Sequence, residues 1–92
     1  MTRVLSSDVL TSELAPLATL GPAEVGLWGM EPGTDHDTEV DEVFVVLAGR
    51  GTVTFEDGEV VDLVPGVAVR LHAGERTTWV VTETLRKVYV AI

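Results

Sequence analysis

The chain contains no cysteine among its 92 residues. This absence excludes disulfide scaffolds, thiol nucleophiles and zinc–thiolate sites. Basic residues are also scarce, because six Lys and Arg stand against 15 Asp and Glu and give a formal net charge of −9. Such a charge repels nucleic-acid phosphates and anionic membrane surfaces, so we expect neither as a partner.

Long apolar runs are missing as well. No segment approaches the ~20 apolar residues that a membrane-spanning helix needs. Arg3, Asp8 and Glu13 interrupt the region where a secretory signal would lie. We therefore expect a cytoplasmic protein with one small domain, and the hydrophobic share of 46% is enough for a single core.

Short apolar runs separated by turn residues dominate the chain after its first quarter. Asp57-Gly58 lies between two such runs and predicts a two-residue hairpin turn in which both residues have positive φ. Pro65-Gly66 predicts a type II turn between the next two runs. About seven short strands with almost no helix are typical of an all-β sandwich or barrel.

The predicted domain organisation is simple. Residues 25–92 are expected to form the β domain. Residues 1–24 are expected to form an arm that is either irregular or contains one short helical turn, since Leu10, Leu14 and Leu17 recur at helical spacing.

Two predicted strands, residues 43–47 and 88–92, are apolar on both faces. A strand in a monomeric sandwich normally has one face in water, so these strands need a second cover. The N-terminal arm is one candidate cover and a second copy of the chain is another. We predict a homodimer formed through an outer sheet face.

The segment Asp35–Glu42, with the sequence DHDTEVDE, holds most of the candidate chemistry. Read as one strand with period two, it has acids at every odd position and has His36, Thr38 and Glu42 on the even face. Burying four unpaired carboxylates is prohibitive, so we expect the odd face in solvent and the even face in the interior. His36 and Glu42 then form a candidate metal-binding or acid–base pair, or a buried hydrogen-bonded pair without chemistry.

Residues 32–51 resemble the first conserved motif of the cupin superfamily. That motif reads Pro-Gly, a few residues, His-x-His, three or four residues, Glu, six residues and Gly. The matching residues are Pro32, Gly33, His36, Glu42 and Gly49. Thr38 stands where the motif has its second His. The resemblance implies a single jelly-roll β-barrel, which agrees with the expected strand pattern.

Residues 65–81 resemble the second cupin motif, with Thr77 in place of its metal-binding His. The end of the chain is similar to the small single-domain cupins related to ureidoglycine aminohydrolase. In those proteins a Trp strand is followed by an Arg-Lys-x-Tyr strand, as in Trp79 and residues 86–89 here.

The departures from these motifs imply a degenerate metal site. Metal-dependent cupins use three His and one Glu, whereas this chain keeps His36 and Glu42 and has Thr at the other two positions. We expect no cofactor. If a divalent transition metal binds, the two remaining ligands favour Mn, Fe, Ni or Zn.

Three classes of function stay open at this stage. The first is a small-molecule binding module, in which Thr38, Thr77 and Trp79 contact the ligand inside the barrel. The second is a small-metabolite enzyme of hydrolase, isomerase or cyclase type, with His36 and Glu42 as catalytic residues with or without a metal. The third is a filled barrel that binds a partner through its surface.

Overall fold

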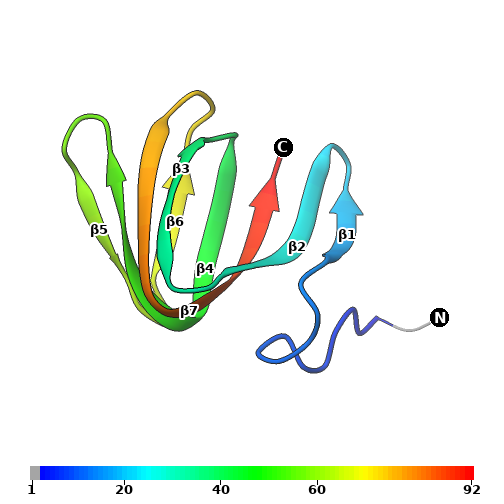
Figure 1. Cartoon of the computed structure of the whole chain (residues 1–92). Helices are drawn as coiled ribbons and strands as arrows, with labels where there is room; N and C mark the ends of the chain where they lie inside the picture. The colour runs from blue at the N-terminus through cyan, green and yellow to red at the C-terminus, as the bar shows by residue number, and fades with distance from the viewer. Residues whose placement is uncertain (1–2) are drawn as a thin grey trace.

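The computed structural model describes residues 3–92, and these residues form seven antiparallel strands (Figure 1). The strands are β1 Pro16–Leu20, β2 Ala23–Met30, β3 Gly33–Thr38, β4 Glu42–Phe55, β5 Val60–Leu63, β6 Ala68–Leu71 and β7 Arg76–Ala91. The described part of the chain contains no helix, so the predicted all-β class is confirmed. Nothing in residues 3–92 is therefore a helix of the length and apolarity that crossing a bilayer requires.

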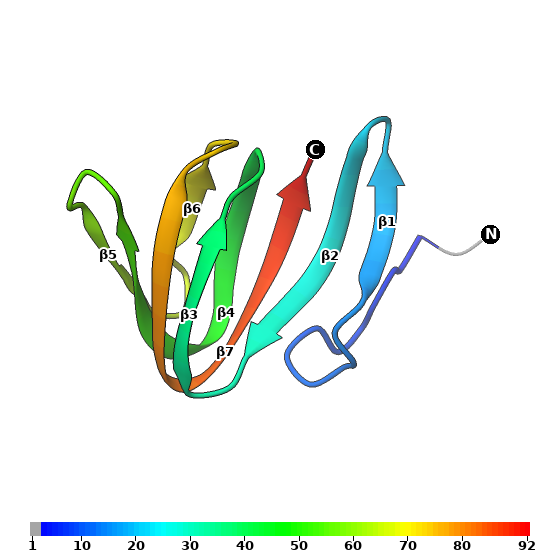
Figure 2. The same ribbon diagram turned by 45° about the horizontal axis from the view of Figure 1, so that its top comes forward.

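Strands β4 and β7 pair along their whole length and belong to two layers (Figures 1 and 2). The start of β7 pairs with β3 and with the end of β4, which also pairs with β5. The end of β7 pairs with β2 and with the start of β4, which also pairs with β6. Both long strands bend between the two parts, so the layers face each other and enclose the interior of a jelly-roll barrel.

The bend in β4 depends on glycine. The β4–β7 register is irregular between Val46 and Gly51, and Gly49 has a φ of +93°, which L side chains rarely adopt. A Cβ at Gly49 would also collide with the backbone of Thr84 and Leu85. The glycine that closes the first cupin motif is thus required by the close approach of the two bent strands.

The core fills the space between the layers. Its fully buried side chains are Phe44, Leu63, Leu71, Leu85, Val46 and Val53. Trp79 and Val81 extend this cluster toward β3. Each of these strands has its apolar side chains in the interior at alternate positions, as period two requires.

Both predicted turns are present, and one differs in its geometry. Gly66 has a φ of +95°, and the amide of Val67 donates to the carbonyl of Val64 at 3.1 Å, as expected for the type II turn. At the Asp57-Gly58 hairpin only Gly58 has a positive φ, +94°. The prediction of two positive φ values was wrong, because residues 55–58 form a turn in which the Gly58 amide donates to the Phe55 carbonyl at 3.0 Å, so that Gly58 alone adopts αL and Asp57 keeps a negative φ.

The N-terminal arm is shorter than predicted. Strand β1 begins at Pro16 and pairs with β2, so the irregular segment ends well before residue 24. One turn is present, in which the amide of Ser12 donates to the carbonyl of Asp8 at 2.8 Å. The first two residues of the predicted arm lie outside the described part of the chain.

Candidate functional site

Strand β3 points the odd positions of the acidic segment inward, which reverses the orientation predicted from the sequence. Asp35 lies opposite Trp79 in the β3–β7 register, and Asp37 lies opposite Thr77. Directly opposed residues of antiparallel strands share a face. Trp79 and Thr77 are each only 4% exposed, so the two aspartates lie on the face that encloses the lumen, at its more exposed edge.

His36 and Thr38 lie on the outer face, so their predicted positions inside the barrel were wrong. His36 is opposite Thr78 in the register, and its Nδ1 is 3.1 Å from the Thr78 hydroxyl. Both His36 and Thr38 are exposed. The predicted pairing of His36 with Glu42 is therefore absent, because the two side chains lie on opposite sides of the barrel wall.

The orientation reverses because residues 35–42 are not one strand. Strand β3 ends at Thr38 and β4 begins at Glu42, with a short connection between them. In that connection the amide of Glu39 donates to the carbonyl of Glu75 at 2.8 Å, and the amide of Gly74 donates back to the Glu39 carbonyl at 2.9 Å. Side chains alternate between the two faces only within a continuous strand. Because the connection interrupts this alternation, the even position Glu42 points inward although the odd positions Asp35 and Asp37 also do.

Glu39 is a buried carboxylate that the sequence interpretation had placed in water. It is 8% exposed. Its Oε2 accepts hydrogen bonds from the Thr77 hydroxyl at 2.7 Å and from Trp79 Nε1 at 3.1 Å. These two donors compensate the loss of hydration, which is the condition under which a carboxylate tolerates burial.

Glu42 forms the second buried polar contact of the lumen, and its partner is Lys87 on β7. Lys87 Nζ donates to Glu42 Oε2 at 2.6 Å, and the two side chains are 6% and 11% exposed. Glu42 therefore lies inside the barrel as predicted, but it contacts an ammonium group in place of an imidazole.

Lys87 is also surrounded by aromatic rings. Its Nζ lies 4.3 Å from the ring centroid of Phe44, 4.7 Å from that of Trp28 and 4.8 Å from that of Trp79. All three distances are within the range of cation–π attraction. The sequence interpretation did not place Lys87 in the lumen. Alternation along the last strand puts Lys87 on the same face as the Tyr89 ring, and a lysine on an apolar face usually needs a charged partner, so this position was the available signal.

Tyr89 is a further aromatic side chain that lines the lumen. Its hydroxyl donates to the Glu24 carboxylate at 2.9 Å. Burial is the main reason that the pKa of Tyr89 is raised above its ordinary value of 10.0, with the hydrogen bond to Glu24 and the negative charges of Glu24 and Glu42 acting in the same direction. The tyrosine is therefore a neutral hydrogen-bond donor at physiological pH.

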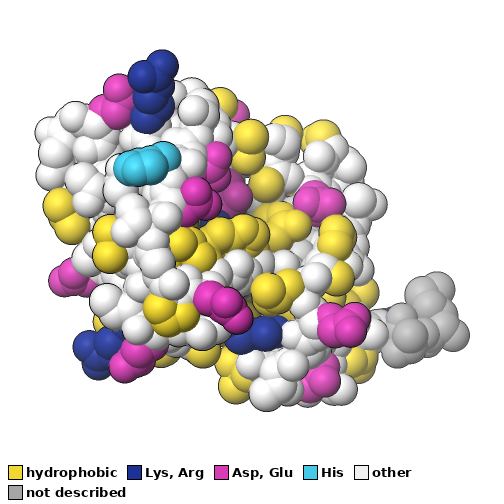
Figure 3. All heavy atoms as spheres, viewed as in Figure 1, with side chains coloured by type: hydrophobic (Ala, Val, Ile, Leu, Met, Phe, Trp, Pro, Cys, Tyr) yellow, Lys and Arg dark blue, Asp and Glu magenta, His cyan; other side chains and the backbone are white. Residues whose placement is uncertain are grey.

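These side chains surround a cavity of about 150 Å³. It is lined by Leu27, Trp28, Asp35, Asp37, Glu39, Glu42, Trp79, Lys87 and Tyr89. Figure 3 shows the hollow in the middle of the molecule, where acidic side chains stand beside an apolar floor. Four carboxylates and one ammonium leave the lining with a formal charge of −3 when every group is ionised.

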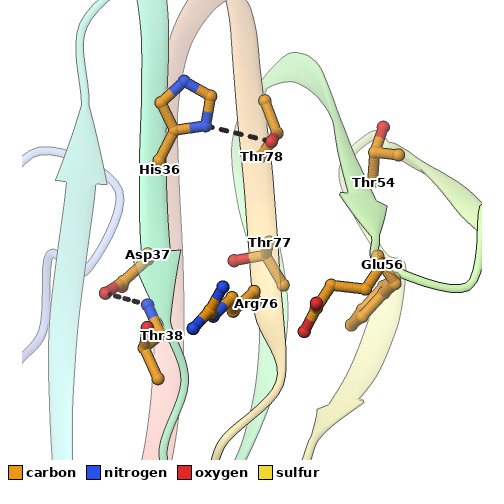
Figure 4. Close-up of a pocket in the computed structure, with 9 residues that line it drawn as sticks. His36, Asp37, Thr38, Thr54, Glu56, Arg76, Thr77 and Thr78 are labelled. Atoms are coloured by element: carbon orange, nitrogen blue, oxygen red, sulfur yellow. Dashed lines mark hydrogen bonds between the residues drawn. The ribbon is translucent and has the colours of Figure 1, made fainter.

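A larger depression of about 490 Å³ lies where β3 and β4 end and β7 begins, and it combines outward-facing residues with Asp37 and Thr77 of the lumen face (Figure 4). Its polar lining consists of His36, Asp37, Thr38, Thr54, Glu56, Arg76, Thr77 and Thr78. Most of these side chains are exposed. We place the functional site in the lumen, because the buried charges with dedicated partners, Glu39, Glu42 and Lys87, line it and do not line the depression.

The residues of the lumen do not fit the transition-metal site of metal-dependent cupins. Within residues 3–92 no three His, Cys, Asp or Glu side chains are grouped in a way that would hold a metal ion. His36 lies outside, Thr77 donates its hydroxyl to Glu39, and Glu42 is bonded to Lys87. The donor set is thus oxygen only, and its motif glutamate already has a cationic partner.

Comparison with known families identifies the chain. Residues 17–89 match the model of the EutQ-like cupin domain. The chain belongs to this family. The cupin fold predicted from the two glycine-containing motifs is thereby confirmed, and the match begins at the second residue of strand β1.

Solved structures of related cupins support the same assignment. A protein of unknown function from Rhizobium leguminosarum is 30% identical with a TM-score of 0.78, and the match covers 99% of this chain and 95% of that one. A DUF861 family protein from Thermotoga maritima is also 30% identical, with a TM-score of 0.67 and coverage of 72% and 76%. A putative ethanolamine utilization protein Q from Salmonella typhimurium is 24% identical, with a TM-score of 0.72 and coverage of 85% and 66%, and shows the fold alone.

One curated protein has a more local similarity. Vicilin GC72-A of Gossypium hirsutum is 37% identical over 60 residues, which are 62% of this chain. The match spans only 10% of that protein's length. It therefore supports the cupin domain and carries no information about the activity of this chain.

The structure also corrects how the first cupin motif aligns with this chain. The motif allows three or four residues between its second His and its Glu. With four residues, the two His positions fall on Asp35 and Asp37, and the Glu position stays at Glu42. This alignment agrees with the inward orientation of all three side chains, whereas the three-residue spacing selected His36 and Thr38 on the outer face.

Proposed function

We propose that this EutQ-like cupin binds a small organic molecule that carries an ammonium group in its barrel lumen, without a metal. The observation that supports this proposal best is the charge of the lining, in which four carboxylates face a single ammonium. Asp35 and Asp37 form no ion pair with any described residue, and each accepts only the backbone amide of the residue that follows it. A ligand cation at the mouth of the lumen would supply the missing positive charge.

The walls of the lumen favour the same ligand chemistry. Trp28 and Trp79 lie 5.5 Å apart between ring centroids, and Tyr89 lines the same space. Because Lys87 Nζ already lies over both tryptophan rings, these walls suit the carbon chain of the ligand, and its ammonium group is left to Asp35 and Asp37. The cavity of about 150 Å³ is well below the ~300–1,000 Å³ of sites for drug-sized ligands, so the ligand has few non-hydrogen atoms.

Ethanolamine is the first probe, since one structural neighbour is described as a putative ethanolamine utilization protein. It is a primary amine with four non-hydrogen atoms. The upper limit of about −1.5 kcal/mol per non-hydrogen atom gives a dissociation constant no tighter than about 40 μM. Both tryptophans of the chain line the lumen, so their fluorescence reports binding directly.

The experiment compares ethanolamine with ethylene glycol, a neutral molecule of the same size. We expect saturable binding of ethanolamine alone, weakened about tenfold or more in the double variant Asp35→Asn with Asp37→Asn. The matched control is Asp57→Asn with Glu59→Gln in the exposed β4–β5 hairpin, which should bind as the wild type does. Equal binding of the two probes, or an unchanged affinity in the Asp35 and Asp37 variant, would disprove an ammonium site.

An enzyme is the second candidate, and the Glu42–Lys87 contact favours it. A carboxylate and an ammonium 2.6 Å apart beside a cavity can serve as proton acceptor and donor for hydrolysis, isomerisation or cyclisation of a small metabolite. Under this proposal Glu42→Gln abolishes turnover of a bound ligand, followed by NMR, and leaves its binding intact. Turnover that survives Glu42→Gln would remove Glu42 from the mechanism.

A closer relationship to the ureidoglycine aminohydrolase-type cupins stays part of this proposal. It rests on Trp79 and on the Arg-Lys-Val-Tyr sequence of β7. In this chain the lysine of that sequence is the one that reaches Glu42, so the resemblance and the lumen chemistry depend on the same residues.

A further inference from the structure

We propose that the ammonium group of Lys87 takes the place of a metal ion in the lumen. Because this ammonium is bonded to Glu42, the Glu42 carboxylate does not bind a metal. Glu42 is the glutamate of the first cupin motif, the residue that metal-dependent cupins use as a ligand. Here its Oε2 is 2.6 Å from Lys87 Nζ. This inference does not depend on which ligand the lumen binds.

The contacts of Lys87 hold its ammonium group inside the lumen. Its side chain is 6% exposed, and its ammonium has Glu42 on one side and three aromatic rings on the others. A cation held by one carboxylate and a cage of rings has the same surroundings as a bound organic cation. The fold therefore provides a cation site and fills it from strand β7.

The ammonium and a divalent ion exclude each other at this carboxylate. A metal bound to Glu42 would lie within a few ångströms of Nζ, where two positive charges repel strongly in a region of low polarity. Moving Lys87 aside would expose its charge to apolar rings without Glu42. We therefore expect the wild-type protein to retain no divalent metal.

The test is chemical rescue of a variant that lacks the ammonium. Lys87→Ala removes three methylene groups and the ammonium, which together have the shape of n-propylammonium. The variant leaves Glu42 buried without a partner, and we expect its melting temperature to fall by about 12 °C or more. Added n-propylammonium should restore most of this loss, and n-propanol, which has the same shape without charge, should not.

Two controls distinguish the loss of the Lys87 charge from the loss of its side-chain volume. Glu42→Gln in the Lys87→Ala background removes the unpaired carboxylate, so n-propylammonium should no longer restore stability. Arg70→Ala removes a cation from the exposed pair with Asp41, where the side chains are 47% and 44% exposed, and should lower the melting temperature only slightly.

If Lys87→Ala does not fold, the double variant Glu42→Met with Lys87→Met replaces both charges by apolar side chains and should fold with near-native stability. Three results would overturn the proposal. They are a wild-type protein that retains about one Mn, Fe, Ni or Zn per chain after desalting, equal rescue by n-propanol, and a Glu42→Met/Lys87→Met variant that fails to fold.

Discussion

At the scale of single residues, partners in distant parts of the chain determine where the charges of this protein lie. Glu39 and Glu42 are buried because Thr77, Trp79 and Lys87 reach them. The sequence argument that four acids on one face must be in water was correct for unpaired charges only. It was wrong for Glu39 alone, because its donors Thr77 and Trp79 come from strand β7, about 40 residues later, whereas Asp35 and Asp37 are exposed and Glu42 was already expected inside.

Tyr89 offers a pH-dependent prediction at the same scale. Burial and Glu24 raise its pKa above 10.0 in the folded protein, so the folded state favours the neutral phenol. Its contribution to stability is therefore fully present below pH ~10 and is lost as the pH rises through the higher pKa of the folded state. Since the chain has one tyrosine, a spectrophotometric titration of phenolate reports this residue alone.

Glu24→Gln tests the cause of that shift. It removes the negative charge beside the phenol, so the titration midpoint should move down toward 10.0 and yet stay above it, because burial remains. Glu59→Gln, an exposed acid in the β4–β5 hairpin, should leave the midpoint unchanged. A midpoint at or below 10.0 in the wild-type protein would contradict the burial of Tyr89.

At the scale of elements, the bend shared by β4 and β7 joins the two layers into a barrel. Gly49 permits this bend by its positive φ and by leaving room for the backbone of Thr84. The glycine was visible in the sequence as part of a motif. Its physical role was not, because the strand that crosses it lies about 35 residues further along the chain.

Gly49→Ala should destabilise the protein by about 2 kcal/mol or more, because it adds both backbone strain and a collision. Gly58→Ala is the matched control, since Gly58 has a φ of +94° but no atom within 4 Å of the position that a Cβ would occupy. It should cost only about 1 kcal/mol. Urea denaturation measures both values, and equal costs would show that the close contact at Gly49 is unimportant.

The end of strand β3 could not be predicted from the sequence. The strands flanking Asp57-Gly58 and Pro65-Gly66 were predicted because glycine and proline mark their ends. Nothing comparable marks the end of β3, since Thr38 and Val40 both have high strand propensity. The sequence therefore read as one continuous strand, and every side chain up to the connection was assigned to the wrong face.

At the scale of the whole molecule, one outer face is apolar. Val43, Val45, Val88 and Val90 are neighbours across β4 and β7 on the side away from the lumen. Val43 and Val90 are 46% and 42% exposed. Strands that are apolar on both faces were expected to need a second cover, and no described residue provides one for these two valines.

The predicted homodimer through this face stays a prediction. A second copy would cover the valines, and an interface of ordinary size persists at ~10 μM. Sedimentation should therefore give a dimer for the wild type and a monomer for Val43→Lys with Val90→Lys. Val80→Lys, at a 39% exposed valine of the other layer, should remain dimeric. A monomeric wild type at that concentration would end the hypothesis.

The sequence by itself determined the all-β class, the approximate number of strands, the positions of the turns at glycine and the cupin superfamily. These features depend on short-range patterns, because turn chemistry and alternation act over a few residues. Only the tertiary structure decided which face of residues 35–42 looks inward and which cation meets Glu42. Those outcomes depend on hydrogen bonds and ion pairs between β7 and residues about 40 positions earlier, and no local pattern encodes the register that brings them together.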